Sequence, residues 1–240
     1  HESRMNILLI APESHQSVGI SRAFEHAGHR VFFLHQRTNY LVPKFLSRNH
    51  TLWRLMIRKI KPLRLINKAR SHAHILELCR REKINMTFSA PKTITRPETL
   101  AWLKGMGVKN VLWFTENPHH PIYKEYLEEH YHNYDTVFLF DSVLAKEMNT
   151  AAGPNCRVLY MPMALDPSYY LADNLTPADQ KKFSCDVCFA GAMYPEREKL
   201  LKAVASLGVE LKIFGWPQWE KSALAQYYQG PLNVNEMAKL

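Results

Sequence analysis

The 240-residue sequence has no apolar run of the roughly 20 residues that a bilayer-spanning helix needs, and its N-terminus shows no signal-peptide pattern. It also has only four cysteines, Cys79, Cys156, Cys185 and Cys188, which are too few for a disulfide scaffold. We therefore expect a protein of the reducing cytoplasm, and neither a secreted nor a membrane-spanning one.

Two nucleotide-binding fingerprints are missing as well. No G-x-G-x-x-G pattern follows the first predicted strand, which argues against the classical binding of NAD or S-adenosylmethionine. No G-x-x-x-x-G-K-[ST] pattern occurs, so the chain is not expected to be a P-loop NTPase.

Acidic residues are absent between Glu25 and Glu77, a stretch that holds eleven Lys and Arg in a chain of net charge +9. From about residue 44 to 70 these cations alternate with apolar residues. This pattern fits an amphipathic helix on an anionic membrane, a surface for an acidic acceptor such as a phosphorylated lipid or polysaccharide, or two packed helices with a solvated basic face. Nucleic acid is not expected as a partner, because the strands carry no aromatic stacking motif.

Eight short segments are almost continuously hydrophobic, as strands are when both faces of a parallel sheet are buried. They are residues 6–12, 29–35, 84–90, 110–116, 135–141, 157–163, 186–192 and 209–215. Stretches of helical period separate them. This alternation predicts a doubly wound α/β domain over residues 5–163, with ligands binding beyond the carboxyl ends of its strands.

Turn and capping residues predict where several helices begin and end. Gly28 is expected to follow the first helix, Pro97 to open another, and Asp141 or Ser142 to cap a third that stops at Gly153. Pro62 is expected to divide the long connection between residues 40 and 83 into two helices.

The composition of the sequence changes after Met163. Residues 164–184 are polar and contain two prolines, which predicts an interdomain linker. A second strand-helix-strand run follows over residues 185–240, with helical stretches at 218–228 and near the end. Because two parallel strands alone cannot form a stable sheet, we expect this domain to be completed beyond Leu240 or supported by the first.

The order of several motifs resembles the CgeB/YkvP-type proteins, a bacterial branch of the GT-B glycosyltransferases near family 4. The segments that carry the resemblance are "NVLWFTENPH", "YDTVFLFD", "LYMPMALDPSYY", "DVCFAGAMYPEREKLL" and "LGVELKIFGWPQW". The resemblance implies two Rossmann-like domains that face each other across a cleft, the second holding a nucleotide-sugar donor without a bound metal. It also implies that the second domain is incomplete here, with the acidic ribose ligand beyond Leu240, so the fragment is expected to be inactive if that part is needed.

Four residues are candidates for the donor site. The turn at Gly191 and the helix after it form an anion site to which Arg197 adds a fork-shaped cation, suited to a departing diphosphate. Gly215 and Trp216 end a strand at the same edge and are candidates for a base pocket. The alternatives are that Arg197 only pairs with neighbouring glutamates, and that Gly215 and Trp216 form a plain turn.

Three residues are candidates for deprotonating an acceptor hydroxyl: His15 after the first strand, and Glu116 and His119 after the fourth. A solvated loop histidine is the alternative. His119 and His120 are not expected to bind metal, because no third ligand is evident. Cys185 and Cys188 are expected to point to opposite faces of a strand, which disfavours a redox or zinc site.

The sequence thus predicts a glycosyltransferase that moves a sugar from a nucleotide diphosphate to an acceptor. The alternative is a non-enzymatic α/β binding module that uses residues 44–70 on an anionic membrane or an acidic partner. A third class is another α/β transferase, or an epimerase, with the same two-domain plan.

Overall fold

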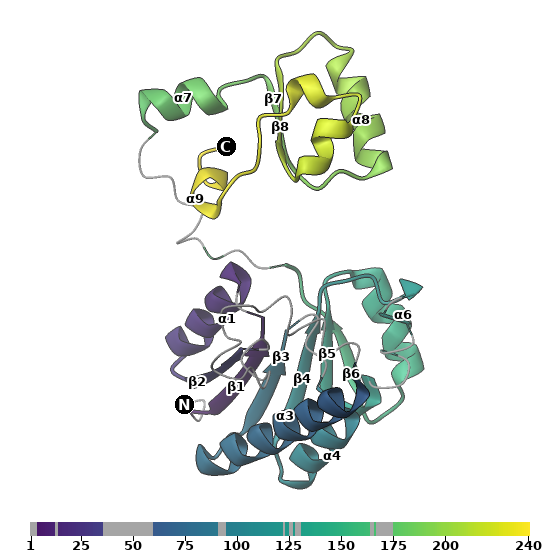
Figure 1. Cartoon of the computed structure of the whole chain (residues 1–240). Helices are drawn as coiled ribbons and strands as arrows, with labels where there is room; N and C mark the ends of the chain where they lie inside the picture. Colours follow the sequence, from purple (N-terminus) through teal and green to yellow (C-terminus); the bar gives the residue numbers. More distant parts are fainter. Residues whose placement is uncertain are drawn as a thin grey trace. The chain divides into compact units, whose positions relative to one another are not determined.

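The computed structural model describes residues 4–12, 14–35, 60–90, 95–121, 123–124, 127, 131–163, 166 and 175–240. The chain divides into two compact units, His1–Ala164 (unit 1) and Leu165–Leu240 (unit 2) (Figure 1). Among the described residues, no helix is both long and apolar enough to cross a membrane.

Unit 1 is built on a sheet of six parallel strands in the order β2-β1-β3-β4-β5-β6. The strands are β1 (Asn6–Ala11), β2 (Arg30–His35), β3 (Met86–Ser89), β4 (Lys109–Phe114), β5 (Thr136–Leu139) and β6 (Arg157–Tyr160). The chain builds outward from β1 to β2 and then crosses back to β3 on the other side of β1. The predicted doubly wound α/β fold is therefore confirmed, with its topological switch point between β1 and β3.

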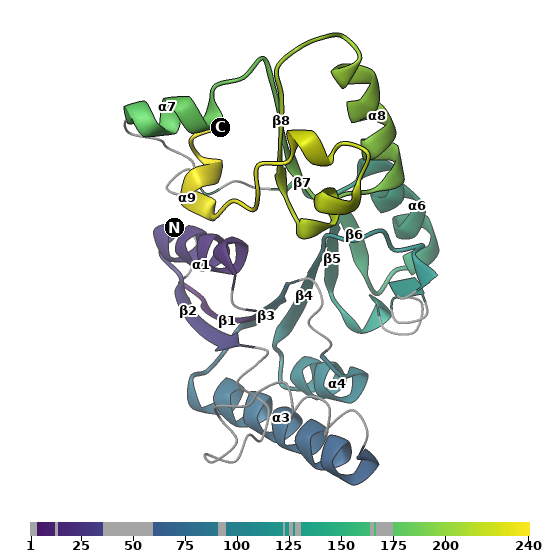
Figure 2. The same cartoon turned by 45° about the horizontal axis from the view of Figure 1, so that its top comes forward.

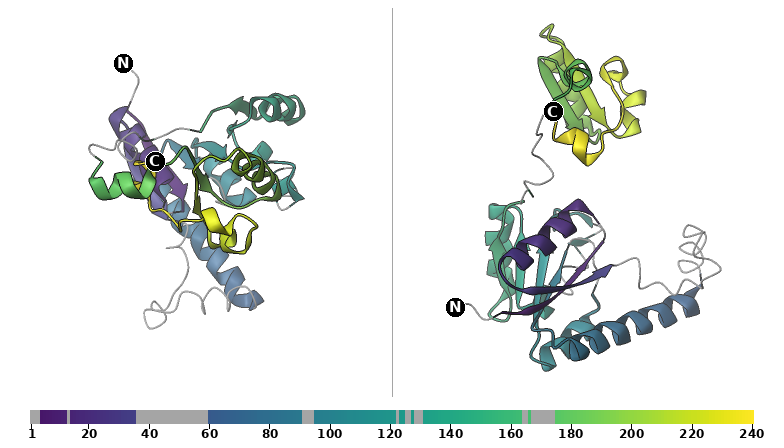
Figure 3. Two further views of the ribbon diagram at one scale, coloured as in Figure 1. Left: turned by 90° about the horizontal axis from the view of Figure 1, so that it is seen from above. Right: turned by 90° about the vertical axis from the view of Figure 1, so that its left-hand side faces the viewer.

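Helices cover both faces of this sheet. Residues of α1 (His15–His26) pack with Ile7 and Leu9 on one face. The opposite face carries Leu8 and Ile10, which pack against α3 (Lys61–Arg81) and α4 (Pro97–Gly105). The helix α6 (Ser142–Ala152) joins α4 in a neighbouring cluster around β4 and β5. Figure 3 shows α3 running along the sheet, with its N-terminal turns extending past the strands.

Most of the predicted helix boundaries are confirmed. Pro62 lies in the first turn of α3, and Pro97 opens α4. Asp141 caps α6 by accepting hydrogen bonds from the amides of Val143 and Leu144, at 2.8 and 2.9 Å. The helix expected before Pro62, and most of residues 121–130, lie outside the described residues; a 3-10 turn, η2, occupies Tyr131–Asn133.

Unit 2 contains two parallel strands, β7 (Val187–Gly191) and β8 (Leu211–Gly215), joined by α8 (Pro195–Ala205). A single bridge between Ile213 and Tyr228 adds a third extended segment beside β8. A small core forms between β7, β8, α8 and the chain after β8. Its buried members are Leu201, Leu211, Ile213, Trp219 and Leu224.

The helix predicted over residues 218–228 is absent, and this prediction was wrong. The chain instead forms two 3-10 turns, η4 (Pro217–Lys221) and η5 (Ala225–Tyr227). Between them, the Glu198 carboxylate accepts hydrogen bonds from the Ser222 hydroxyl and the Ala223 amide, at 2.8 and 3.1 Å. These contacts, together with the burial of Trp219, interrupt the helical path.

Part of the predicted linker is folded. Within residues 164–184 lies α7 (Pro177–Phe183), which Thr176 caps by accepting a hydrogen bond from the Asp179 amide. Phe183 packs on Phe214 of β8, with ring centroids 5.8 Å apart. Two ion pairs join α7 to the C-terminal helix α9 (Val234–Met237) and the residues after it (Figure 2): Asp179–Lys239 at 2.9 Å and Lys182–Glu236 at 2.6 Å. The segment from Leu175 onward is therefore part of unit 2.

Candidate functional site

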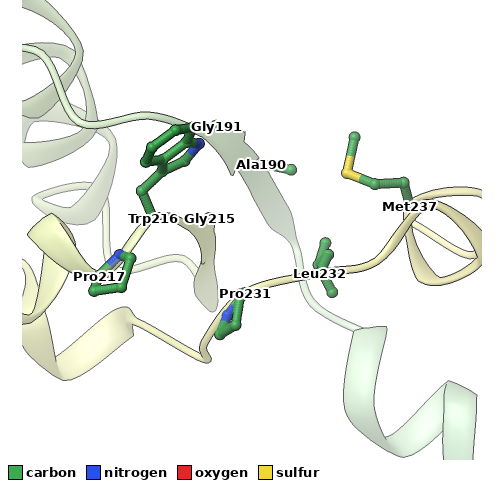
Figure 4. Close-up of a pocket in the computed structure, with 8 residues that line it drawn as sticks. All are labelled: Ala190, Gly191, Gly215, Trp216, Pro217, Pro231, Leu232 and Met237. Atoms are coloured by element: carbon green, nitrogen blue, oxygen red, sulfur yellow. The ribbon is translucent and has the colours of Figure 1, made fainter. Parts of the chain in front are cut away.

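A cavity of about 380 Å³ lies at the carboxyl ends of β7 and β8 in unit 2 (Figure 4). This size lies within the range of small-molecule sites, and the carboxyl edge of a parallel sheet is where such sites form. The lining is mostly apolar and comes from both strand ends, η4, the segment before α9, and α9 itself. The residues are Ala190, Gly191, Gly215, Trp216, Pro217, Pro231, Leu232 and Met237.

The floor of the cavity is a close backbone contact between Gly191 and Gly215, which are partners in the β7–β8 register. Gly215 has φ +141°, a conformation that side chains with a Cβ rarely adopt. A Cβ there would also meet the carbonyl oxygen of Gly191 and lie 2.9 Å from its carbonyl carbon. The site therefore requires glycine at position 215.

Hydrogen bonds fix the backbone around these glycines. The Gly191 carbonyl accepts from the indole N–H of the buried Trp219 at 2.9 Å. The Gly215 carbonyl accepts from the Tyr228 hydroxyl at 3.0 Å, and the Gly215 amide donates to Gly230. The floor is thus held in place from several elements of unit 2.

Trp216 forms one wall of the cavity, and about 64% of its surface remains exposed. Figure 4 shows its indole beside Gly191, with Met237 on the far side of the opening. An exposed aromatic ring at the edge of a cavity offers a flat surface on which a planar ligand group can stack.

Arg197, predicted to face a diphosphate, lies outside the set of residues that line the cavity. Its Nη1 donates to the Ala192 carbonyl at 3.0 Å, and its guanidinium lies 4.9 Å from the Tyr194 ring centroid. Among the described residues no ion pair joins it to Glu196 or Glu198. Arg197 therefore holds the turn after β7, and its cationic group remains on the exposed surface of that turn.

The first turn of α8 also carries two carboxylates, Glu196 and Glu198. The pKa of Glu198 is lowered, mainly because the Ser222 hydroxyl and the Ala223 amide donate hydrogen bonds to it. The Glu198 carboxylate therefore stabilises the loop between η4 and η5 by accepting hydrogen bonds from it.

In unit 1 the candidate bases lie on two loops at one edge of the sheet. His15 is the first residue of α1, whose start is fixed by a capping box between Ser14 and Ser17. Glu116 and His119 follow β4, where the Asn117 side chain accepts from the His119 amide at 2.9 Å. Because β3 lies between β1 and β4, the two loops are separated by about two strand spacings of roughly 4.8 Å each.

His119 has a charged neighbour that the sequence did not indicate. Its Nε2 lies 3.5 Å from a carboxylate oxygen of Glu147 on α6, and both side chains are at least half exposed. Within the described ranges no group of three or more His, Cys, Asp or Glu side chains is arranged to hold a metal ion.

Two buried hydroxyls of unit 1 were not singled out from the sequence. Ser89 ends β3 and Thr95 precedes α4, and in the described part of the chain neither hydroxyl has a hydrogen-bond partner. Nothing in the sequence distinguishes these two residues from the other serines and threonines of the chain.

No protein-family model matches the chain, and no curated protein matches it significantly in sequence. Solved structures do match its fold. A UDP-GlcNAc 2-epimerase from Methanocaldococcus jannaschii aligns with a TM-score of 0.58 and 10% identity over 98% of this chain and 76% of that one. A glycosyltransferase from Rickettsia africae aligns with a TM-score of 0.58 and 10% identity over 99% of this chain and 70% of that one.

A third match is S. aureus MnaA in a co-structure with UDP, with a TM-score of 0.59 and 12% identity over 98% of this chain and 71% of that one. Identities this low establish likeness of fold. The chain therefore has the α/β GT-B architecture, with two Rossmann-like units in succession.

Proposed function

We propose that this chain is a glycosyltransferase that takes a sugar from a nucleotide diphosphate, with the nucleotide bound in the unit 2 cavity. The observation that carries the proposal is the position of this cavity, at the carboxyl ends of β7 and β8 in a GT-B fold. The solved structures of similar fold include a glycosyltransferase and a protein seen with UDP, which supports the same ligand class.

The cavity suits the base and ribose of a nucleotide better than its phosphates. Its lining is apolar, Trp216 offers a stacking surface, and the paired glycines let a ligand approach the backbone closely. The diphosphate would then extend toward the turn after Gly191 and the N-terminus of α8, where Arg197 supplies a positive charge. That charge would stabilise the nucleoside diphosphate as it leaves.

The acceptor would be activated from unit 1. A general base must reach the acceptor hydroxyl and hold a lone pair near neutral pH, and His15, Glu116 and His119 are the candidates at the carboxyl edge of that sheet. We expect no bound metal to be needed, as in the CgeB/YkvP-type proteins that the sequence resembles.

Calorimetric titration with UDP tests the nucleotide site. Trp216→Ala should weaken binding about tenfold, because stacking on a base contributes about 1–3 kcal/mol. The matched control is Trp102→Ala, which removes another exposed tryptophan, from α4 in unit 1, and should leave affinity unchanged. Equal affinity of wild type and Trp216→Ala would remove Trp216 from the site.

Two variants, Arg197→Ala and Arg197→Lys, separate a role of Arg197 in binding the diphosphate from its role in holding the turn after β7. If Arg197 binds the diphosphate, Arg197→Ala should weaken UDP binding while uridine, which lacks phosphates, binds wild type and variant alike. Arg197→Lys should recover part of the UDP affinity through its charge. Equal losses for UDP and uridine would show that Arg197 acts only by holding the turn.

Product analysis separates a transferase from an epimerase, the other activity named among the similar folds. Incubation with a UDP-sugar, followed by NMR of the products, should show free UDP and released or transferred sugar. A UDP-sugar inverted at one carbon, with no free UDP, would favour the epimerase.

A second candidate function rests on the N-terminal half of α3. There Leu65 and Ile66 are each about half exposed, in a stretch where the sequence has many cations and no acidic residue. A binding module of this kind would associate with anionic vesicles in a salt-sensitive way. Sedimentation with vesicles containing phosphatidylserine should then show binding that neutral vesicles lack, whereas a purely soluble transferase would stay in the supernatant with both.

A further inference from the structure

One wall of the unit 2 cavity comes from the C-terminal segment of the chain. Leu232, before α9, and Met237, in α9, both line the cavity, and Figure 4 shows Met237 across the opening from Trp216. The core of unit 2, as far as the structure describes it, contains neither side chain, and about 39% of the surface of Met237 is exposed. Core packing therefore does little to hold this wall in place.

The helix α9 cannot hold the wall by itself either, because it has only four residues. Its own hydrogen bonds are local. The Asn233 side chain accepts from the Glu236 amide at 3.0 Å, and the Glu236 carboxylate accepts from the Asn233 amide at 3.0 Å. An isolated helix of one turn is unstable in water, since fixing its backbone costs more than its few hydrogen bonds return. The position of α9 must depend on contacts with other elements.

The helix α7 supplies these contacts through two ion pairs, which we call the α7–α9 clamp. The Lys182 ammonium lies 2.6 Å from a Glu236 carboxylate oxygen, and the Lys239 ammonium lies 2.9 Å from both carboxylate oxygens of Asp179. Among the described residues, no other hydrogen bond or ion pair joins residues 231–240 to the rest of unit 2. One pair holds α9 itself, and the other holds the chain just after it.

The helix α7 is in turn fixed to the sheet. Phe183 packs on Phe214 of β8. Lys212, also on β8, donates to the carbonyls of Ser184 and Lys182 at 2.7 and 3.2 Å, which places a cation at the C-terminal end of α7, where the helix favours one. Because β8 also ends at the cavity floor, α7 connects the wall at α9 to the strand that forms the floor.

The carboxylates of the clamp are ionised at neutral pH. The pKa of Glu236 is lowered, mainly because the Lys182 side chain donates a hydrogen bond to it, and the pKa of Asp179 is lowered to about 2, mainly because Lys239 does the same. Lys182 is about 45% exposed, and ion pairs this accessible to water are individually weak. Changing one pair should therefore be enough to loosen α9.

We propose that Asp179 and Lys182 are positioning residues for the nucleotide site, which hold α9 and its Met237 side chain against the cavity through Lys239 and Glu236. This inference rests on the proposed function, because the nucleotide is the ligand of that cavity. If the wall is in place for only a fraction of the time, the apparent affinity falls by that fraction. Loosening the clamp should thus weaken nucleotide binding although neither positioning residue lines the cavity.

Calorimetric titration with UDP tests this role. Lys182→Glu sets a second carboxylate against Glu236 and should weaken UDP binding about three- to tenfold, whereas Lys182→Arg keeps the charge and should bind like wild type. The matched control is Lys181→Glu, which makes the same change of charge one residue earlier on α7. The Lys181 side chain is exposed and makes no ion pair with a described residue, so this variant measures how the added charge alone affects the binding of an anionic ligand.

A second measurement follows α9 without any nucleotide. In NMR spectra of the chain labelled on its methionine methyl groups, the Met237 signal is identified by its loss in Met237→Leu. In Lys182→Glu this signal should sharpen and move toward the position of an unfolded chain. The signal of Met193, which packs on the unit 2 core, should stay in place, whereas general destabilisation of unit 2 would move both. Lys182→Arg and Lys181→Glu should leave both signals unchanged.

Two results would overturn the inference: a Met237 signal that does not respond to Lys182→Glu, or UDP affinities that are the same in Lys182→Glu and Lys181→Glu. Failure of the wild type to bind UDP would contradict the proposed function and, with it, the role of the clamp in a nucleotide site. The Met237 signal would still decide whether α7 holds α9, so the two failures are distinguishable.

Discussion

Gly215 tolerates substitution poorly, for two independent reasons. Its φ of +141° disfavours any residue with a Cβ, and a Cβ there would meet the backbone of Gly191. We expect Gly215→Ala to destabilise unit 2 by about 3 kcal/mol or more, since strained backbone of this kind costs about 1–3 kcal/mol before the clash is added. Thermal unfolding measures the loss.

Gly208→Ala is the matched control for this substitution. Gly208 also has a positive φ, +75°, but an added Cβ would find open space. We expect a loss of only about 1–2 kcal/mol there. If the two variants unfold at the same temperature, the close contact between the two glycines does not constrain the fold.

The sequence allowed a residue of the cavity to be predicted where that residue lies at or just after the end of a predicted strand. Gly191, Gly215 and Trp216 were identified in this way, and all three line the cavity. Arg197 was also identified, but a sequence cannot show that its guanidinium hydrogen-bonds to the Ala192 carbonyl. Met237 was missed because its place at the cavity depends on contacts between segments about 50 residues apart.

At the scale of elements, α7 and α9 are joined by ion pairs whose strength depends on pH. The pKa of Asp179 is lowered from its usual 3.8 to about 2, mainly because Lys239 and the Thr176 hydroxyl donate hydrogen bonds to it. A lowered pKa in the folded state means that the stabilisation is complete above about pH 4 and is lost as the pH falls toward 2.

Asp179→Asn should remove this part of the pH dependence, because the amide oxygen still accepts from Thr176 at the helix cap while the charge is gone. We expect the difference in melting temperature between wild type and Asp179→Asn to shrink steadily between pH 4 and pH 2. A difference that stays constant over this range would show that the Asp179–Lys239 pair adds nothing to stability.

Elements were predicted with uneven success, and the physical reasons differ. All eight strands in the described part of the chain were predicted, because strands buried on both faces leave continuous apolar runs. The turns η4 and η5 were mistaken for a helix because residues 218–228 contain no glycine or proline that would stop one. The carboxylate of Glu198, which interrupts the helical path, comes from α8.

At the scale of the whole molecule, the order of strands and helices determines what the chain resembles. Alternating hydrophobic and helical stretches predicted a doubly wound α/β fold, and the strand order β2-β1-β3-β4-β5-β6 in unit 1 confirms it. The sugar and the acceptor depend on a few side chains that vary freely within such a fold, so fold alone does not specify them.

The central claim is that unit 2 binds the nucleotide part of a sugar donor. Two-dimensional amide NMR of the labelled chain during titration with UDP tests it most directly, since weak binding is also visible. We predict saturable shifts of the backbone amides of Gly191 and Gly215 and of the Trp216 indole, with residues of α3 and α4 unmoved. No shift at millimolar UDP, or shifts confined to unit 1, would contradict the account.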